Sequence, residues 1–333
     1  MLQRLNLREN NFIGGFPVWV ANMKSLVYLD ISSNHLTGPL PFNCSGLQNL
    51  QELYLSHNFL WGIIPPWLFT LPSLEYLALS SNLFAGQIPE FKRNLPLLDI
   101  SLSDNKLHGT IPQSIYTLVN LTYLLLSSND LSGGVDLQKL KNLKYLDLSN
   151  TNLSLITTSG ANNTFPSLRE IYMSSCNIEV VPDFLRTSEK LVRRDISNNI
   201  IRGQIPNWVG FIGKASLSYL NLSHNFLTDI KQLPWERLQT LVLHSNSLQG
   251  QLPTPPPSIQ YFFISNNSLS GEIPSLICNA SSLQILDLSA QEGGEIEKNG
   301  YRHFGKKKVT NIGSHPSTER RRKLLLLLEI IME

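Results

Sequence analysis

The stretch LNLSHNFLT, residues 220–228, is one copy of a pattern that recurs through most of this 333-residue chain. A second copy is LDLSNTNLS, residues 146–154. Both fit the pattern Leu-x-x-Leu-x-Leu-x-x-Asn-x-Leu, and its Asn position returns every 21 to 26 residues. Self-similarity at a short period is typical of a solenoid, in which equivalent turns stack and each buries the face of its neighbour.

Twelve residues fill the Asn position of the pattern. Ten of them are asparagines: Asn10, Asn34, Asn58, Asn82, Asn105, Asn129, Asn199, Asn225, Asn246 and Asn267. Thr151 and Cys176 fill the other two, although Asn150 and Asn152 leave open a shift of one residue at Thr151. We expect a buried ladder of hydrogen bonds here, because an amide side chain can satisfy backbone groups of its own turn and of the next. Cys and Thr keep a weaker or smaller part of that capacity.

The residues around the Asn position predict the rest of each turn. Leu-x-Leu alternation, as in Leu53 and Leu55, indicates a short strand with one buried face, and equivalent strands should pair into a long parallel sheet. The motif Gly-x-Ile-Pro follows, for example as GIIP (62–65) and GEIP (271–274). Gly permits a tight turn and Pro removes a backbone donor, so we expect irregular or 3-10 structure on the opposite side.

The repeat resembles the plant-type leucine-rich repeat over about residues 1–289. The resemblance implies an α/β-type horseshoe with a parallel sheet on its concave face. Residues 149–199 and 252–289 are similar to the middle of resistance-type plant receptor-like proteins, in which an extracellular horseshoe stands on one membrane helix and signals through a partner kinase. One departure is Arg194, where that family has Leu, so we expect the turn to be locally distorted or damaged unless the charge is paired.

Residues 290–333 differ from the repeats. They hold nine Lys or Arg and six Asp or Glu, are punctuated by Gly and Pro, and predict a disordered basic tail. Gln291 stands where the thirteenth Asn is expected. Our main interpretation is a truncated or mis-spliced reading frame, and the weaker alternative is a basic tail for nucleic acid or nuclear import.

Both ends also lack the cysteine-paired caps that the resemblance implies, which predicts a fragment of a larger horseshoe. The first residues have no apolar segment of the signal-peptide kind. The longest apolar run, residues 324–332, is shorter than the roughly 20 residues that a membrane-spanning helix needs.

The cysteines are too far apart in the predicted solenoid to pair. Cys44, Cys176 and Cys278 lie in different turns, separated by six and then four turns. At about 4.8 Å for each strand, both gaps far exceed the Cα separation of about 7 Å that a disulfide tolerates.

Since no disulfide indicates an oxidising compartment, the location of the protein is inferred from N-glycosylation motifs. Asn-x-Ser/Thr occurs at Asn43, Asn120, Asn152, Asn162, Asn221, Asn266 and Asn279. Asn221 and Asn266 fall on strand phrases and fit an accidental match best, whereas Asn43, Asn162 and Asn279 lie in expected loops. We therefore predict that the parent protein is glycosylated and extracellular.

No pattern indicates catalysis, a metal site or a cofactor. The chain has no Gly-x-Ser-x-Gly, His-x-x-x-His or Cys-x-x-Cys motif. His224 and His244 fall in adjacent turns and are expected to lie near one another, but a metal site needs at least one more ligand. The formal net charge of +2 gives no strong preference for nucleic acid or a membrane surface.

Two columns of strand residues are expected to face outward on the concave side. One column carries Tyr28, Tyr76, Tyr123, Tyr145, Tyr219 and Tyr261. The next carries Tyr54, Tyr172 and Phe263, where the repeat usually has Asp or Asn. Aromatic side chains are favoured interface anchors, so we predict ligand binding at these three residues, with their side chains in solvent. Arg169, Glu170 and Arg193 add a charged patch, in which the two arginines flank Tyr172 and would favour an acidic group on the ligand.

The predicted function is ligand recognition by a plant cell-surface immune receptor-like protein, at the extracellular face of the plasma membrane and without catalysis. The expected partners are an extracellular protein, peptide or glycan and a receptor kinase, and no nucleic acid. Three alternatives stay open: a secreted inhibitor of cell-wall-degrading enzymes, part of a receptor-kinase ectodomain, or a non-functional truncated product.

Overall fold

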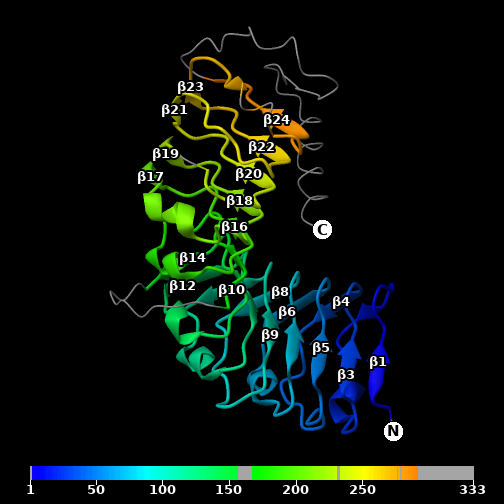
Figure 1. Ribbon diagram of the computed structural model, residues 1–333. Helices are drawn as coiled ribbons and strands as arrows, with labels where there is room; N and C mark the ends of the chain where they lie inside the picture. The colour runs from blue at the N-terminus through cyan, green and yellow to red at the C-terminus, as the bar shows by residue number, and fades with distance from the viewer. Residues whose placement is uncertain (1, 157–166, 231–232, 276, 278–279, 292–333) are drawn as a thin grey trace.

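The protein is a curved solenoid of stacked turns. The computed structural model describes residues 2–156, 167–230, 233–275, 277 and 280–291. Each turn starts with a short strand, and successive strands lie side by side from β1 at one end to β24 at the other (Figure 1). The predicted parallel-sheet leucine-rich-repeat fold is confirmed. The predicted tail from 292 onward lies outside the described residues.

The first sheet contains thirteen parallel strands among the described residues, one for each turn. They are β1 (Arg4–Asn6), β3 (Tyr28–Asp30), β5 (Glu52–Tyr54), β7 (Tyr76–Ala78), β9 (Asp99–Ser101), β11 (Tyr123–Leu125), β13 (Tyr145–Asp147), β15 (Glu170–Tyr172), β16 (Arg193–Asp195), β18 (Tyr219–Asn221), β20 (Thr240–Val242), β22 (Tyr261–Phe263) and β24 (Ile285–Asp287). The central residue of each strand points into the core, as Leu53 and Leu77 do at 1 % exposure. We call the opposite, outward-facing side of this sheet the concave face.

A second parallel sheet, which the sequence pattern did not indicate, follows the Asn position on the other side of the solenoid. Its seven strands are β2 (Ile13–Gly14), β4 (His35–Gly38), β6 (Phe59–Ile63), β8 (Leu83–Gly86), β10 (Lys106–Gly109), β12 (Asp130–Val135) and β14 (Asn152–Leu155). Two further pairs form beyond it: β17 (Arg202–Gln204) with β19 (Phe226–Asp229), and β21 (Gln249–Gly250) with β23 (Ser268–Leu269). The expected 3-10 segments are η1 (Val18–Asn22), η2 (Pro66–Thr70), η3 (Gln113–Thr117), η4 (Leu137–Lys139), η5 (Asp183–Thr187) and η6 (Asn207–Phe211).

The last strand of the second sheet among the described residues is β14. Gly62, four residues after Asn58, has a φ of 89°, and several glycines at the same place in other turns also have a positive φ. Leu155 fills this place in β14 itself, and Val180 fills it in the eighth turn, which has no strand of this sheet among the described residues.

The buried asparagines form the predicted ladder. The Nδ2 of Asn58 donates to the carbonyl oxygens of Leu55 at 3.1 Å and Ser56 at 3.3 Å in its own turn, and to that of Ile31 at 3.0 Å in the preceding turn. Its Oδ1 accepts from the Leu36 amide at 2.9 Å. One side chain therefore satisfies four backbone groups in two turns, which holds the stack together where no strand can.

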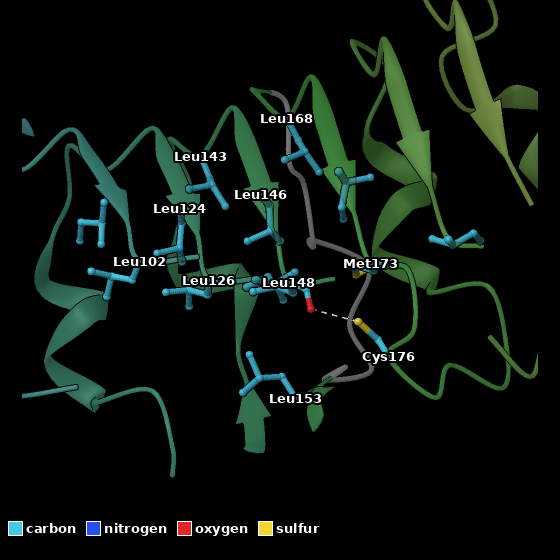
Figure 2. Close-up of a cluster of buried hydrophobic side chains, with 14 of the residues drawn as sticks. Leu102, Leu124, Leu126, Leu143, Leu146, Leu148, Leu153, Leu168, Met173 and Cys176 are labelled. Carbon is cyan, nitrogen blue, oxygen red and sulfur yellow. Dashed lines mark hydrogen bonds between the residues drawn. The ribbon is translucent and has the colours of Figure 1, made fainter. Parts of the chain in front are cut away.

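Thr151 and Cys176 occupy the ladder, so the one-residue shift considered for Thr151 does not occur. The Thr151 hydroxyl donates to the Leu148 carbonyl at 2.7 Å. The Cys176 thiol lies 3.1 Å from the same oxygen, as the dashed line in Figure 2 shows among the surrounding core leucines. Cys176 is 9 % exposed, and its burial raises the pKa of the thiol. Cys44 and Cys176 are both free thiols, whereas Cys278 lies outside the described residues.

Gln291 completes a thirteenth rung, which the sequence pattern did not predict. Its Oε1 accepts from the Leu269 amide at 3.2 Å, and its Nε2 donates to the Ile264 carbonyl at 3.0 Å. Ala290 before it has a φ of 51°, like the residues that precede the other rungs. Gln carries the same amide as Asn on one more methylene, so the repeat geometry reaches two residues past the boundary predicted at 289.

Arg194 is buried in the core without distorting the strand. β16 keeps an unshifted register with both neighbours, so the distortion expected here is wrong. The side chain is 1 % exposed, and its Nε and Nη2 have no hydrogen-bond partner in the part of the chain that the structure describes. Burial lowers the pKa of the guanidinium to about 9. Ser188 is equally buried, and its hydroxyl likewise has no partner among the described residues. It replaces the leucine of other turns, such as Leu71. The turn therefore has less side-chain volume than other turns at Ser188 and more at Arg194.

Replacing Asn129 by Ala should destabilise the fold by about 2–4 kcal/mol, because it removes three donated hydrogen bonds and one accepted bond from buried backbone groups. The free energy of unfolding in urea measures this. The control, Asn120→Ala, changes an exposed asparagine outside the ladder and should stay within about 0.5 kcal/mol of the parent. Equal losses in the two variants would contradict a structural role for the ladder.

Replacing Arg194 by Leu should stabilise the protein by about 1–4 kcal/mol, because the change removes an uncompensated buried cation and restores the residue usual at this position. Urea unfolding again provides the measurement. Arg169→Leu is the matched control, since Arg169 is exposed and its replacement should change stability by less than about 0.5 kcal/mol. A destabilised Arg194→Leu protein would show that the guanidinium has an unrecognised partner.

Candidate functional site

The concave face carries two registered columns of side chains. Strand pairing sets Tyr28 beside Glu52 in one column and Asp30 beside Tyr54 in the next. The register is unshifted across the sheet from β1 to β24, so every turn adds one residue to each column. The predicted assignment of the tyrosines to these two columns is therefore confirmed, while their role in binding stays a prediction.

Several tyrosines of the face are tied to carboxylates two residues away. The hydroxyl of Tyr54 donates to Glu52 at 3.0 Å, and that of Tyr172 donates to Glu170 at 2.9 Å. Burial, followed by the neighbouring carboxylate, raises the pKa of both phenols. Residues at i and i+2 of a strand face the same side, which explains why these pairs recur. The rings of Tyr172 and Tyr145 also pack at 5.3 Å between centroids.

Phe263 does not point freely into solvent, which corrects one expectation. It is 9 % exposed, and its registered neighbours are Val242, at 2 % exposure, and Asp287, at 8 %. Strands lie only about 4.8 Å apart, so a ring between two side chains of the same column is largely covered. Phe263 contributes to packing as well as to the surface, and its replacement would perturb the fold.

The predicted charged patch is only partly assembled. Glu170 and Arg193 are registered neighbours in one column, whereas Arg169 is exposed and precedes β15. The guanidinium carbon of Arg193 lies 5.7 Å from the ring centroid of Tyr219. The two columns of the face hold seven carboxylates and two guanidinium groups: Asp30, Glu52, Asp99, Asp147, Glu170, Asp195 and Asp287, with Arg4 and Arg193. The balance is acidic, which does not favour the acidic ligand group that was expected.

A hollow of about 390 Å³ opens on the concave face between β5 and β13. Four tyrosines line it together with apolar, hydroxyl and carboxyl side chains: the lining residues are Tyr54, Tyr76, Leu77, Ala78, Asp99, Ser101, Tyr123, Leu125 and Tyr145. We call it the tyrosine hollow. Asp99 stands between Tyr76 and Tyr123 in the same column. Asp99 was not predicted as a site residue from the sequence, since a carboxylate at an outward strand position usually serves solubility.

Asp99 is unusual among the carboxylates of the face. Its Oδ1 is buried and has no hydrogen-bond partner among the described residues. Desolvation by burial raises the pKa of this carboxyl from 3.8 to about 6. Tyr145, at the edge of the hollow, has its pKa raised to about 12, first by burial and then by Asp147 and Glu170.

The two histidines predicted to be neighbours do approach each other. The rings of His224 and His244 lie 4.7 Å apart, edge to face. Burial and the adjacent His224 lower the pKa of His244 to about 4, so its imidazole is neutral at physiological pH. Within the described part of the chain, no group of three or more His, Cys, Asp or Glu side chains is arranged to hold a metal ion.

The glycosylation motifs occupy different environments. Asn43, Asn120 and Asn152 are exposed, and so is Asn266, which also donates to Ser245. Asn221 lies on β18, where its amide donates to Asp195 at 2.9 Å on the concave face. Asn162 and Asn279 lie outside the described residues. Of the helices that the structure describes, none has the length and hydropathy to cross a bilayer.

Comparison with protein families agrees with the repeat. A leucine-rich-repeat family model matches residues 41–84, and a second leucine-rich-repeat model matches residues 1–23, 25–47, 142–163 and 258–280. Receptor-like protein 7 of Arabidopsis thaliana is 36% identical over 160 residues, which are 46% of this chain and 16% of that protein. Receptor like protein 24 of the same plant is 35% identical over 156 residues, 46% of this chain and 18% of that protein. The matched region thus spans less than a fifth of the length of these relatives.

Solved structures extend the similarity to most of the solenoid. The ectodomain of the Arabidopsis receptor kinase HAESA, in complex with an N-terminally extended IDA peptide hormone, aligns with a TM-score of 0.71 at 30% identity. The alignment covers 84% of this chain and 48% of that ectodomain. The structure of PEPR1–AtPEP1 aligns with a TM-score of 0.69 at 30% identity and covers 86% and 45% of the two chains. The chain is therefore a leucine-rich-repeat protein, and it is similar to plant receptor-like proteins and to the ectodomains of plant receptor kinases.

Proposed function

We propose that this chain is the ligand-recognition part of a plant cell-surface receptor-like protein and that it binds an extracellular peptide through its concave face. The observation that carries the proposal is the registered pair of columns, in which aromatic residues stand at outward positions that core packing does not require. Leucines and ladder amides are constrained by packing, so recognition can vary only in the side chains that remain.

The similar structures support a peptide ligand and a partner kinase. HAESA aligns over 84% of this chain in its complex with a peptide hormone. Another HAESA structure, with IDA and the co-receptor SERK1, aligns with a TM-score of 0.68 at 29% identity. By analogy, the proposed parent protein acts at the extracellular face of the plasma membrane in defence signalling, without catalysis, and recruits a receptor kinase. A kinase domain in the parent protein would favour the receptor-kinase alternative, and a parent without one would favour a receptor-like protein.

Selection of random displayed peptides on the immobilised chain tests the proposed function. Tyr172→Ala should weaken binding of the selected peptides by about 1–4 kcal/mol, because a half-buried aromatic anchor is lost from the concave face. Calorimetry with the parent and the variant measures this difference, and circular dichroism confirms that both are folded.

The matched control is Ile13→Ala, which removes an apolar side chain, 82 % exposed, from the second sheet. Peptide affinity should be unchanged by this substitution. Peptides that lose affinity with Ile13→Ala and keep it with Tyr172→Ala would place binding on the second sheet and contradict the proposal.

A further inference from the structure

The tyrosine hollow contains a carboxylate, that of Asp99, which forms no ion pair with any described residue. Three other carboxylates of the concave face accept a tyrosine hydroxyl: Asp30 from Tyr28, Glu52 from Tyr54, and Glu170 from Tyr172. In β9 the residue two positions from Asp99 is Ser101 and not a tyrosine. The Ser101 hydroxyl is hydrogen-bonded to the Ser80 hydroxyl at 2.6 Å. The Oδ1 of Asp99 is buried and has no hydrogen-bond partner among the described residues. An unpaired buried polar group is costly, and Asp99 lines the hollow, so a donor or cation that entered the hollow would meet an uncompensated carboxyl group.

The walls of the hollow suit a cation. Tyr76 and Tyr123 are the registered neighbours of Asp99, and the Tyr123 ring is stacked against Tyr145 at 5.8 Å between centroids. A cation over the face of a tyrosine ring is attracted by the negative potential of the ring. The concave face already shows this contact at its first strand, where the guanidinium carbon of Arg4 lies 4.1 Å from the centroid of Tyr28.

The described residues supply no cation at the hollow itself. Of the lining residues that the structure describes, none is Lys, Arg or His. Within the two columns of the described sheet, the guanidinium groups belong to β1 and to β16, whereas the hollow lies between β5 and β13. The surrounding face is acidic, with seven carboxylates against two guanidinium groups, and so attracts positive charge.

We propose that the tyrosine hollow binds a basic side chain, lysine or arginine, of a peptide ligand, with Asp99 as its counter-ion and Tyr76 and Tyr123 as its aromatic walls. The inference rests on the proposed function, because it assigns the chemistry of the ligand at one point of the concave face. A metal ion fits less well, since one carboxylate between aromatic rings offers too few oxygen ligands. A neutral sugar would leave the charge of Asp99 uncompensated.

Four capped heptapeptides of the sequence Gly-Ser-Gly-X-Gly-Ser-Gly, with X as Lys, Arg, norleucine or Glu, test the ligand chemistry. NMR titration of the full chain should show saturable shifts with the Lys and Arg peptides and at least tenfold weaker binding of the other two. Asp99→Asn should weaken the Lys and Arg peptides at least tenfold. Tyr123→Phe should keep most of the affinity, because the aromatic face remains, whereas Tyr123→Ala should not.

Asp130→Asn is the matched control. Asp130 is an exposed carboxylate at the start of β12 in the second sheet, so its replacement should leave the binding of every peptide unchanged. Cellobiose is titrated in parallel as a neutral sugar probe. Equal affinity of the Lys and norleucine peptides, Lys binding that survives Asp99→Asn, or preferential binding of cellobiose would each overturn the inference. The proposed function would then still be judged separately by Tyr172→Ala.

The pH dependence of binding has a defined sign. The free carboxyl of Asp99 has its pKa raised to about 6, and a bound cation requires it to be ionised. Affinity for the Lys peptide should therefore be full above pH 7 and fall as the pH drops through 6 toward 4. The other titratable groups that face the hollow are tyrosines, with Glu52 and Asp147 beside its ends, and Asp99→Asn should abolish the dependence. An unchanged dependence in Asp99→Asn would overturn the assignment of Asp99.

Thermal unfolding tests whether the Asp99→Asn protein is folded, and it also checks independently that the carboxyl of Asp99 is unsatisfied in the fold. The folded pKa of Asp99 lies above the unfolded value, so its ionisation destabilises the fold as pH rises between 4 and 6. Asp99→Asn should accordingly raise the melting temperature at pH 8 and lose that advantage at pH 4. A variant that melts earlier at pH 8 would mean that Asp99 serves the structure, which overturns its role as an unsatisfied ligand-binding carboxylate.

Discussion

The hydrogen bonds of the ladder amides are the constraint on which the rest of the solenoid depends. Each leucine-lined turn must bend back after its strand, and the bend leaves backbone groups inside the protein. Asn58 and its equivalents satisfy those groups in two consecutive turns at once, so the spacing between turns is set where there is no sheet. With the spacing set, strands pair in unshifted register, and residues from turns that are distant in sequence align in columns.

Most of the fold could be read from the sequence because it follows from short-range periodicity. Alternation placed Leu53 in the core and Tyr54 on the concave face, and the register confirms both. Features that depend on neighbouring turns could not be read. The second sheet needs the pairing of successive segments, most of which lack the Leu-x-Leu alternation by which the strands of the first sheet were predicted. Gln291 was excluded by residue type, although its amide reaches the same backbone groups as Asn.

The candidate site divides in the same way. The columns that contain Tyr54 and Tyr172 were predictable because they follow from the repeat, whereas the burial of Phe263 and the unpartnered oxygen of Asp99 arise from side chains of adjacent turns. Arg194, in the core, shows that prediction from the sequence has the same limit there. Its position in the core was predictable, but the undistorted strand around it was not, since packing between turns decides whether a misfit residue is accommodated.

The concave face therefore repeats the same backbone geometry in every turn while its side chains differ, and in the tyrosine hollow the described residues leave the carboxyl group of Asp99 uncompensated. The most direct test of this account is paramagnetic relaxation enhancement by the Gly-Ser-Gly-Lys-Gly-Ser-Gly peptide carrying a terminal spin label. The account predicts that signal loss centres on the tyrosines of the hollow, Tyr54, Tyr76, Tyr123 and Tyr145. Signal loss centred on β6, β8 and β10 of the second sheet, with the hollow unaffected, would contradict it.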